Sequence, residues 1–288
     1  MNFKDENSPF PLNSGIRIKG FLMDFSTPKI MGIINLSPDS FYAGSRFKSD
    51  GKLIQKVEKM IEEGADMIDL GAFSSRPGAK LIEEAEEMKR LMPALKLIAK
   101  KFPELPISVD TYRSEVALQA VNEGASIIND ISGGTYDSRM FKTISELDVP
   151  YILMHLRGKP ENMQKNIHYE HLVGDIFAFF TEQLKSLRSM QVKDVILDLG
   201  FGFGKTLDQN YQLLKQLKYF KTLACPILAG ISRKGMIRMV VDRPTEDTLD
   251  GTTAAQMIAL LNEVNILRVH DVKPAADAIK IFSYYQKQ

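Results

Sequence analysis

Short apolar runs recur along this chain, and patterned segments separate each run from the next. The first such segment carries Leu53, Val57 and Met60 on one face, at the three-and-four spacing of an amphipathic helix. The apolar runs are β-branched and short, which predicts strands rather than helices. The predicted strands span residues 29–36, 67–72, 106–110, 126–132, 150–156, 194–200, 226–232 and 266–271.

Eight strands that alternate with helices in a chain of 288 residues predict an α/β fold, a TIM (β/α)8 barrel. An open doubly wound sheet is the alternative. No linker-like segment divides the chain, so we expect residues 29–288 to form one barrel domain. Residues 1–28 are a short N-terminal extension, in which Ile16, Ile18, Phe21 and Met23 surround Gly20. This pattern predicts a hairpin that plugs the N-terminal end of the barrel.

Polar residues stand at or near the ends of the predicted strands. They are Asn35, Asp69, Asp110, Asn129, Asp198, Ser232 and His270. In a (β/α)8 barrel the C-terminal strand ends all meet at one face, where active sites lie. The polar residues therefore predict a ring around a single site. Two long connections, residues 37–50 and 73–82, follow the first two strands and are expected to act as lids.

The residue types in the ring indicate a flat, nitrogen-rich ligand. Carboxylates at Asp110 and Asp198, with the amide of Asn129, can pair with the amino and N–H edge of a heterocycle, and Lys234 can donate to a ring carbonyl or nitrogen. Apolar residues precede both carboxylates, and an unpaired buried carboxylate is costly. Asp69, in contrast, is more simply explained as pairing with a neighbour or capping a turn.

Cationic side chains gather near the last two strands, where barrels often hold phosphate. Arg233 and Lys234 follow the seventh strand, and Arg268 and His270 lie on one side of the eighth. Arg76, on the second long loop, can reach the same anion. A diphosphate there would need a cation such as Mg²⁺, to which Asn35 offers an oxygen ligand.

Other polar residues have simpler explanations. His155 ends the fifth strand, and lining the site and packing in the core are equally good readings of it. His168 and His171 flank Glu170 on what we expect to be an exposed turn, without the further ligands that a metal site needs. The glycine-rich stretch 199–206 is not a P-loop, because only three residues separate Gly200 from Gly204. Its glycines instead let the backbone and Phe203 approach a planar ligand.

Composition excludes bulk attraction to nucleic acid or to anionic membranes, since the net charge is +1 and the pI is about 7.7. The chain has a single cysteine, Cys225, which excludes an intrachain disulfide and fits a reducing compartment. No stretch of about 18 apolar residues is present. We therefore expect a cytoplasmic protein with small-molecule substrates.

Eight motifs, in order, resemble those of the dihydropteroate synthase family, a folate-pathway family of TIM barrels. They are Met31-Gly-Ile-Ile-Asn-Leu-Ser-Pro-Asp-Ser-Phe41, Ser75-Arg-Pro-Gly-Ala79, Ser108-Val-Asp-Thr111, Ile128-Asn-Asp-Ile131, Met154-His-Leu-Arg-Gly158, Leu197-Asp-Leu-Gly-Phe-Gly-Phe-Gly-Lys205, Gly230-Ile-Ser-Arg-Lys234 and Leu267-Arg-Val-His-Asp-Val272. The resemblance covers the chain from about residue 29 to residue 281. Any one motif would be weak evidence, whereas eight in register are specific.

The resemblance implies a reaction and a role for each matching residue. The reaction joins 6-hydroxymethyl-7,8-dihydropterin diphosphate to 4-aminobenzoate, gives 7,8-dihydropteroate and pyrophosphate, and uses Mg²⁺. Asp110, Asn129, Asp198 and Lys234 would hold the pterin between Met154 and Phe203. Arg268, His270 and Asn35 would hold the diphosphate and its metal, and Ser75, Arg76 and Ser232 would meet the aminobenzoate. Asp198, Lys234, Arg268 and His270 would carry the catalysis.

This chain departs from the family pattern at a few positions. Phe73 stands where many members have a glutamate, Ser75 replaces a threonine, and Leu199 replaces a proline. These changes leave the pterin set intact. Two alternatives remain: a corrinoid-dependent methyltransferase that binds a pterin, and a non-catalytic paralogue. The cluster of Lys234, Arg268 and His270 and the Ser75-Arg76 loop speak against the methyltransferase. The retained Arg76 and Ser232-Arg233-Lys234 speak against the paralogue. The resemblance also implies a homodimer, with the late outer helices as the place for its interface.

Overall fold

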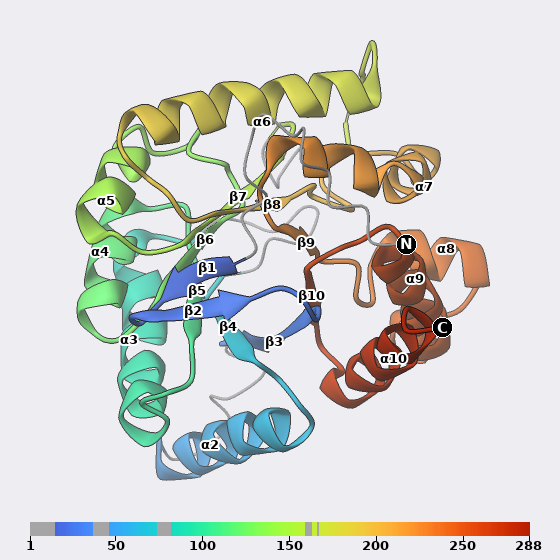
Figure 1. Cartoon of the computed structure of the whole chain (residues 1–288). Helices are drawn as coiled ribbons and strands as arrows, with labels where there is room; N and C mark the ends of the chain where they lie inside the picture. The colour runs from blue at the N-terminus through green and yellow to red at the C-terminus, as the bar shows by residue number, and fades with distance from the viewer. Residues whose placement is uncertain (1–14, 37–45, 74–81, 159–162, 166) are drawn as a thin grey trace.

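A closed barrel of eight parallel strands forms the centre of the molecule (Figure 1). The computed structural model describes residues 15–36, 46–73, 82–158, 163–165 and 167–288. The strands, in chain order, are β3 (Lys29–Asn35), β4 (Met67–Gly71), β5 (Ile107–Asp110), β6 (Ile127–Asp130), β7 (Tyr151–Met154), β8 (Val195–Asp198), β9 (Ile227–Ala229) and β10 (Ile266–Val269). The last strand pairs with both β9 and β3, so the sheet has no edge. This closure confirms the predicted barrel and rules out the open doubly wound sheet.

Helices surround the barrel as an outer ring (Figure 1). They are α2 (Arg46–Glu62), α3 (Glu84–Lys101), α4 (Ser114–Asn122), α5 (Met140–Leu147), α6 (Leu172–Ser189), α7 (Leu207–Lys215), α8 (Gly235–Val241), α9 (Leu249–Leu261) and α10 (Val272–Tyr285), with short 3₁₀ helices η1 (Leu217–Leu223) and η2 (Thr245–Asp247). In the described part of the chain, no helix is long and apolar enough to cross a membrane.

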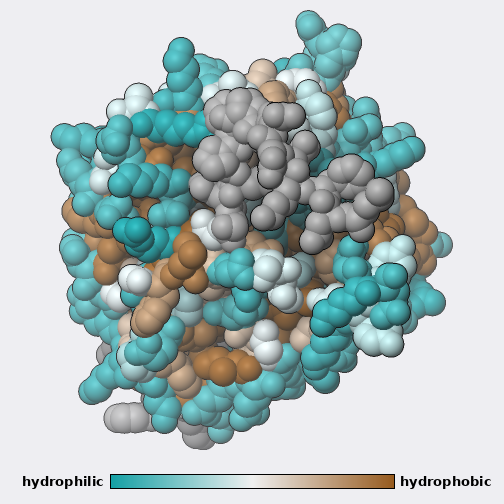
Figure 2. All heavy atoms as spheres, in the orientation of Figure 1, coloured by the Kyte–Doolittle hydropathy of each residue, from teal (hydrophilic) through white to brown (hydrophobic). Residues whose placement is uncertain are grey.

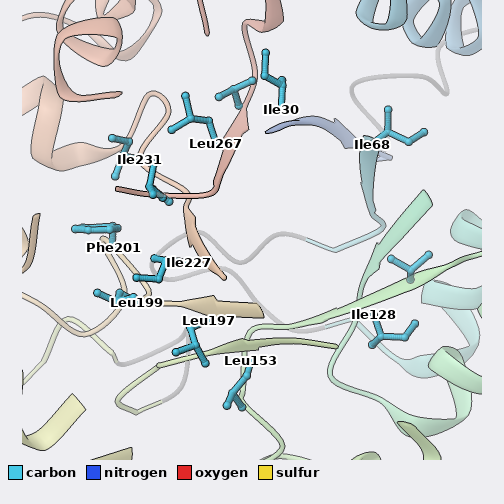
Figure 3. Close-up of a cluster of buried hydrophobic side chains, with 14 of the residues drawn as sticks. Ile30, Ile68, Ile128, Leu153, Leu197, Leu199, Phe201, Ile227, Ile231 and Leu267 are labelled. Carbon is cyan, nitrogen blue, oxygen red and sulfur yellow. The ribbon is translucent and has the colours of Figure 1, made fainter. Parts of the chain in front are cut away.

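Alternate strand residues fill two separate apolar layers. One set, which includes Ile68, Leu153 and Leu267, points outward between the strands and the helices (Figure 3). The neighbouring residues, such as Met67 and Ile152, point into the barrel and form the apolar layer inside its N-terminal end. Both sets are fully buried, at roughly 1.5–3 kcal/mol for each large side chain. A strand buried on both faces therefore reads as a continuous apolar run.

The N-terminal hairpin closes the N-terminal end of the barrel, as the sequence predicts. Its strands, β1 (Gly15–Ile18) and β2 (Phe21–Asp24), are antiparallel, and in Figure 1 they cross the opening of the strand ring. The turn is Lys19-Gly20, with φ of 50° and 81°, the left-handed pair that a two-residue hairpin needs. Ile16 and Ile18 pack against the inward-pointing strand residues and are buried.

Some predicted boundaries are wrong. The first long loop was expected to reach residue 50, but α2 already begins at Arg46. Its first turn, Arg46-Phe-Lys-Ser49, has a single apolar residue, so no repeated apolar spacing predicts the helix start. The predicted strand 226–232 is also too long, since β9 ends at Ala229 and the backbone at Arg233 is left-handed, with φ of 54°. Residues 37–45 and 74–81, most of the two predicted lids, lie outside the described residues.

Candidate active site

Strand register brings the predicted polar ring together at the C-terminal face of the barrel. Asp110 lies beside Gly71 on one side and Asn129 on the other, and Asp198 lies beside Met154. The side chains of Asp110, Asn129 and Asp198 are buried. The strand ends therefore bring polar side chains of β5, β6 and β8 to one face of the barrel, as predicted.

Several oxygen atoms in this ring have no hydrogen-bond partner among the described residues. They are Asp110 Oδ1, Asn129 Oδ1 and Asp69 Oδ1. A buried polar atom without a partner costs about 1–3 kcal/mol, and more when it is charged. Three such atoms on adjacent strands mark a place where a ligand with N–H groups would be stabilised.

Asp69 belongs to this site, although its position in the sequence favours a simpler role, pairing with a neighbour or capping a turn. Its fully buried Oδ2 accepts hydrogen bonds from Arg268 Nε at 2.7 Å and from Asn129 Nδ2 at 3.2 Å. The expected pairing with a neighbour is correct, but the neighbours are site residues. Alternation was the available signal, because Met67, Asp69 and Gly71 share the inward face of β4.

Arg268 lies between two carboxylates. Its Nη2 is 2.6 Å from Asp69 Oδ2 and 3.4 Å from Asp110 Oδ2. Burial raises the pKa of Asp110 well above its ordinary value, the charge of Asp69 raises it further, and Arg268 opposes both. The guanidinium is thus held in the barrel mouth, as predicted, by partners that the sequence did not identify.

Lys234 stands at the start of α8 and reaches back over the glycine-rich loop. Its Nζ donates to the carbonyl oxygen of Phe201 and lies 4.4 Å from the centre of the Phe203 ring. Burial lowers the pKa of Lys234 to about 8, with Asp198 opposing the change and Arg268 adding to it. Asp198 Oδ1 accepts the N–H of Gly200 at 2.8 Å. The structure thus brings Asp198, Lys234 and Phe203 together, as predicted.

Met154 and Phe203 form part of an apolar wall beside the polar ring. They belong to a buried cluster with Phe73, Tyr112, Ile131 and Met163. The Phe73 and Tyr112 rings meet edge to face, with centroids 5.5 Å apart. The residue that replaces the family's glutamate therefore packs into the wall.

Arg233 and His270, two members of the predicted group of cations, differ from Lys234 and Arg268 in their surroundings. Arg233 is paired with Asp271 through two hydrogen bonds of 2.7 and 2.8 Å, so its charge is already neutralised. Burial lowers the pKa of His270 to about 4, with Arg268 and Arg233 adding to the effect and Asp271 opposing it. His270 is therefore a neutral hydrogen-bonding group near pH 7. Sequence position alone could reveal neither the pairing nor the burial.

Ser232 is tied to His270. Its Oγ accepts the backbone N–H of His270 at 3.2 Å and lies 3.1 Å from Nδ1 of the same residue.

Asn35 ends β3 and is exposed. A Cβ at Gly71 would lie 3.7 Å from both Asn35 Oδ1 and Asp110 Oδ2, so both side chains approach the same glycine. Ser75 and Arg76 lie outside the described residues, and their predicted contacts stay untested.

Of the other three histidines, one is buried and two are exposed. His155 packs in the core, with its Nδ1 3.1 Å from Lys205 Nζ and its ring edge to face with Phe179. His168 and His171 are exposed and precede α6. Across the described ranges, no group of three or more His, Cys, Asp or Glu side chains is placed to bind a metal ion.

Comparison with known proteins defines the class. The family model for pterin binding enzymes matches residues 31–270, which includes every described residue of the polar ring. With the barrel and the partnerless acceptors in its mouth, this match places the chain in the pterin binding enzyme family.

Individual relatives narrow the class further. A dihydropteroate synthase of Haemophilus influenzae is 40% identical over 262 residues, which are 90% of this chain and 94% of the relative. Among solved structures, the Yersinia pestis dihydropteroate synthase with a sulfonamide drug complex has a TM-score of 0.88 at 33% identity, covering 95% of this chain and 100% of that one. The Xanthomonas albilineans dihydropteroate synthase with 4-aminobenzoic acid has a TM-score of 0.87 at 33% identity, covering 95% and 99%. The chain belongs to the dihydropteroate synthase family.

Proposed function

We propose that this enzyme condenses 6-hydroxymethyl-7,8-dihydropterin diphosphate with 4-aminobenzoate to give 7,8-dihydropteroate and pyrophosphate. The observation that carries the proposal is the set of buried, partnerless acceptors at Asp69, Asp110 and Asn129, next to the cations Arg268 and Lys234. A pterin has an amino group and ring N–H groups on one edge and ring acceptors on another. It can supply the donors that this pocket lacks.

In the proposed complex, different residues would contact the edges and the faces of the pterin. Asp198, Asp110 and Asn129 would accept from its N–H edge, and Lys234 would donate to its ring. Met154 and Phe203 belong to the same apolar wall and would contact its faces. Arg268 is fixed by Asp69 at 2.7 Å, and it would stack on the pterin and reach the diphosphate.

The chemistry requires no covalent attachment to the protein. The bond between the pterin methylene carbon and the diphosphate oxygen breaks, and the electron pair leaves with pyrophosphate. The lone pair of the aminobenzoate nitrogen forms the new bond to carbon, and that nitrogen then loses a proton. The cation Arg268 and the neutral donor His270 would stabilise the leaving group, while the carboxylates would favour the electron-poor pterin.

A magnesium ion fits the oxygen donors of this site. Mg²⁺ usually keeps several waters and binds through one or two protein oxygens plus the phosphates of the substrate. The amide oxygen of Asn35, at the open end of β3, provides one such ligand. When bound, the ion would neutralise charge on the departing pyrophosphate. Ser75, Arg76 and Ser232 would meet the aminobenzoate.

We also propose a homodimer and a cytoplasmic location. Exposed apolar residues support the dimer, because seven of the thirteen large ones among the described residues lie on three neighbouring helices, α8 to α10. They are Met239, Val240, Ile258, Leu261, Ile281, Tyr284 and Tyr285. Figure 2 shows apolar side chains at its right edge, where α8 lies in Figure 1. The single cysteine, Cys225, supports the location.

The decisive experiment measures pyrophosphate release from purified protein given the pterin diphosphate, 4-aminobenzoate and Mg²⁺. Release that depends on both substrates and falls after chelation supports the proposal. Pterin binding without release would identify a non-catalytic paralogue. Methyl transfer to a corrinoid, again without release, would identify the methyltransferase.

A further inference from the structure

Side chains hold six consecutive carbonyl groups of the glycine-rich loop that follows β8. The six carbonyl oxygens of residues 200–205 each accept a hydrogen bond from a side chain. The donors are Lys205, Lys234, Gln164, Tyr169 and Asn210. A loop of this composition would be flexible by itself, so the side chains supply its rigidity.

Lys205 is the donor that joins two points of this loop. Its Nζ is 2.9 Å from the carbonyl oxygen of Gly200, 3.0 Å from that of Phe203, and 3.1 Å from His155 Nδ1. These are the three nearest acceptors for the three donors of the ammonium group, and the carbonyl oxygen of His155 lies farther away, at 3.5 Å. The residue is only 2% exposed, and the proposed reaction does not use it.

The neighbours of Lys205 suit this arrangement. Burial lowers the pKa of His155 well below its ordinary value, and Lys205 and Arg157 add to the effect, which favours the neutral ring. In the tautomer that carries its proton on Nε2, the Nδ1 atom accepts from Lys205. Burial also lowers the pKa of Lys205 to about 7, Asp198 opposes the change, and Lys234 adds to it.

The segment that Lys205 spans also contacts Lys234. The Phe201 carbonyl accepts from Lys234 Nζ, and the Phe203 ring lies 4.4 Å from it. The Phe201 side chain itself points away, into the outer apolar cluster with Leu199 (Figure 3). The loop is therefore anchored in the outer cluster by Phe201 and bridged by Lys205, while its Phe201 carbonyl and Phe203 ring contact Lys234.

We infer that Lys205 is a positioning residue for the pterin site: by bridging Gly200 and Phe203 it holds the loop in the shape that places the Lys234 ammonium group. The inference rests on the proposed pterin site. Lys205 touches neither substrate, and it acts only through the Phe201 carbonyl and the Phe203 ring.

A double-mutant cycle tests this inference, with the dissociation constant for 6-hydroxymethylpterin measured by calorimetry. Lys205→Met removes the three hydrogen bonds and is expected to raise this constant about tenfold or more. In a Lys234→Met background, the same substitution should change it by less than about twofold, because the group being positioned is gone. If Lys234→Met binds too weakly to measure, Phe203→Leu takes its place in the cycle.

A matched control separates positioning from general loss of stability. Tyr151→Phe removes another buried hydrogen bond, the 2.7 Å contact with Asp130, and should leave the pterin constant unchanged. If Lys205→Met does not fold, Lys205→Gln replaces it in the same cycle. Effects of Lys205 and Lys234 that multiply independently would overturn the inference. Failure of the unsubstituted protein to bind the pterin would instead count against the proposed function.

Discussion

At the scale of single residues, the carboxylate of Asp198 gives the clearest prediction about pterin binding. Asp198→Asn replaces an acceptor with a donor on one side of the pocket, so we expect pterin affinity to fall about 10- to 100-fold. Calorimetric titration with the pterin would measure the loss. Ser75→Ala should instead mainly raise the Michaelis constant for 4-aminobenzoate. Reversed effects of the two substitutions would mean that the two ends of the site are wrongly assigned.

Lys234 predicts a pH dependence. In the proposed site its charged ammonium form would donate a stronger hydrogen bond to the pterin than the neutral amine. Burial lowers its pKa to about 8, so activity should fall as pH rises through about 8. The kcat/KM for the pterin diphosphate, followed from about pH 6 to about pH 10, would show this basic limb. Lys234→Arg stays protonated and should move the limb to higher pH. A limb that does not move in this variant belongs to another group.

The titration of Lys234 does not destabilise the folded protein in this pH range, so unfolding caused by Lys234 would not explain the loss of activity. Its pKa is lower in the folded chain than the ordinary value of 10.5, so the unfolded chain binds more protons between about pH 8 and that value. The contribution of Lys234 to the free energy of unfolding therefore rises with pH in that window. A loss of activity there reflects the site.

At the scale of elements, the N-terminal hairpin acts as a structural plug. Ile18→Ala leaves a cavity between the hairpin and the apolar layer inside the barrel, and should lower the free energy of unfolding by about 2–5 kcal/mol. Phe21→Ala, at a side chain that is 68% exposed on the same hairpin, should change it by less than about 0.5 kcal/mol. Denaturant unfolding of both variants makes the comparison. Equal effects would show that the hairpin does not support the barrel.

The elements also show how far local pattern reaches. All eight strands were predictable, because each is buried on both faces and reads as an apolar run. Their ends were less predictable, as α2 and β9 show, since a first helical turn or a strand end depends on neighbouring elements rather than on its own residues. Lys19-Gly20, in contrast, carries its turn in its own sequence.

At the scale of the whole molecule, the proposed dimer makes a testable claim. Leu261→Glu or Tyr284→Glu places a charge in the exposed apolar surface of α9 and α10, and should convert the dimer to a monomer in sedimentation experiments. Phe21→Glu, on the hairpin at the N-terminal end of the barrel, is the matched control and should leave the dimer intact. If neither helix variant dissociates the protein, the interface lies elsewhere or the protein is a monomer.

The sequence by itself determined the barrel, the ring of polar strand ends and the family, because alternation along a strand and the order of motifs are local properties. Only the tertiary structure decided which hydrogen bonds and ion pairs the side chains of the ring form. Arg268 meets Asp69 across 199 positions of chain, and Arg233 is neutralised by Asp271. Lys205 folds back beneath the loop that it ends. The physical reason is that burial and pairing set the charge and direction of each polar group, and both depend on which distant residues the closed barrel brings together.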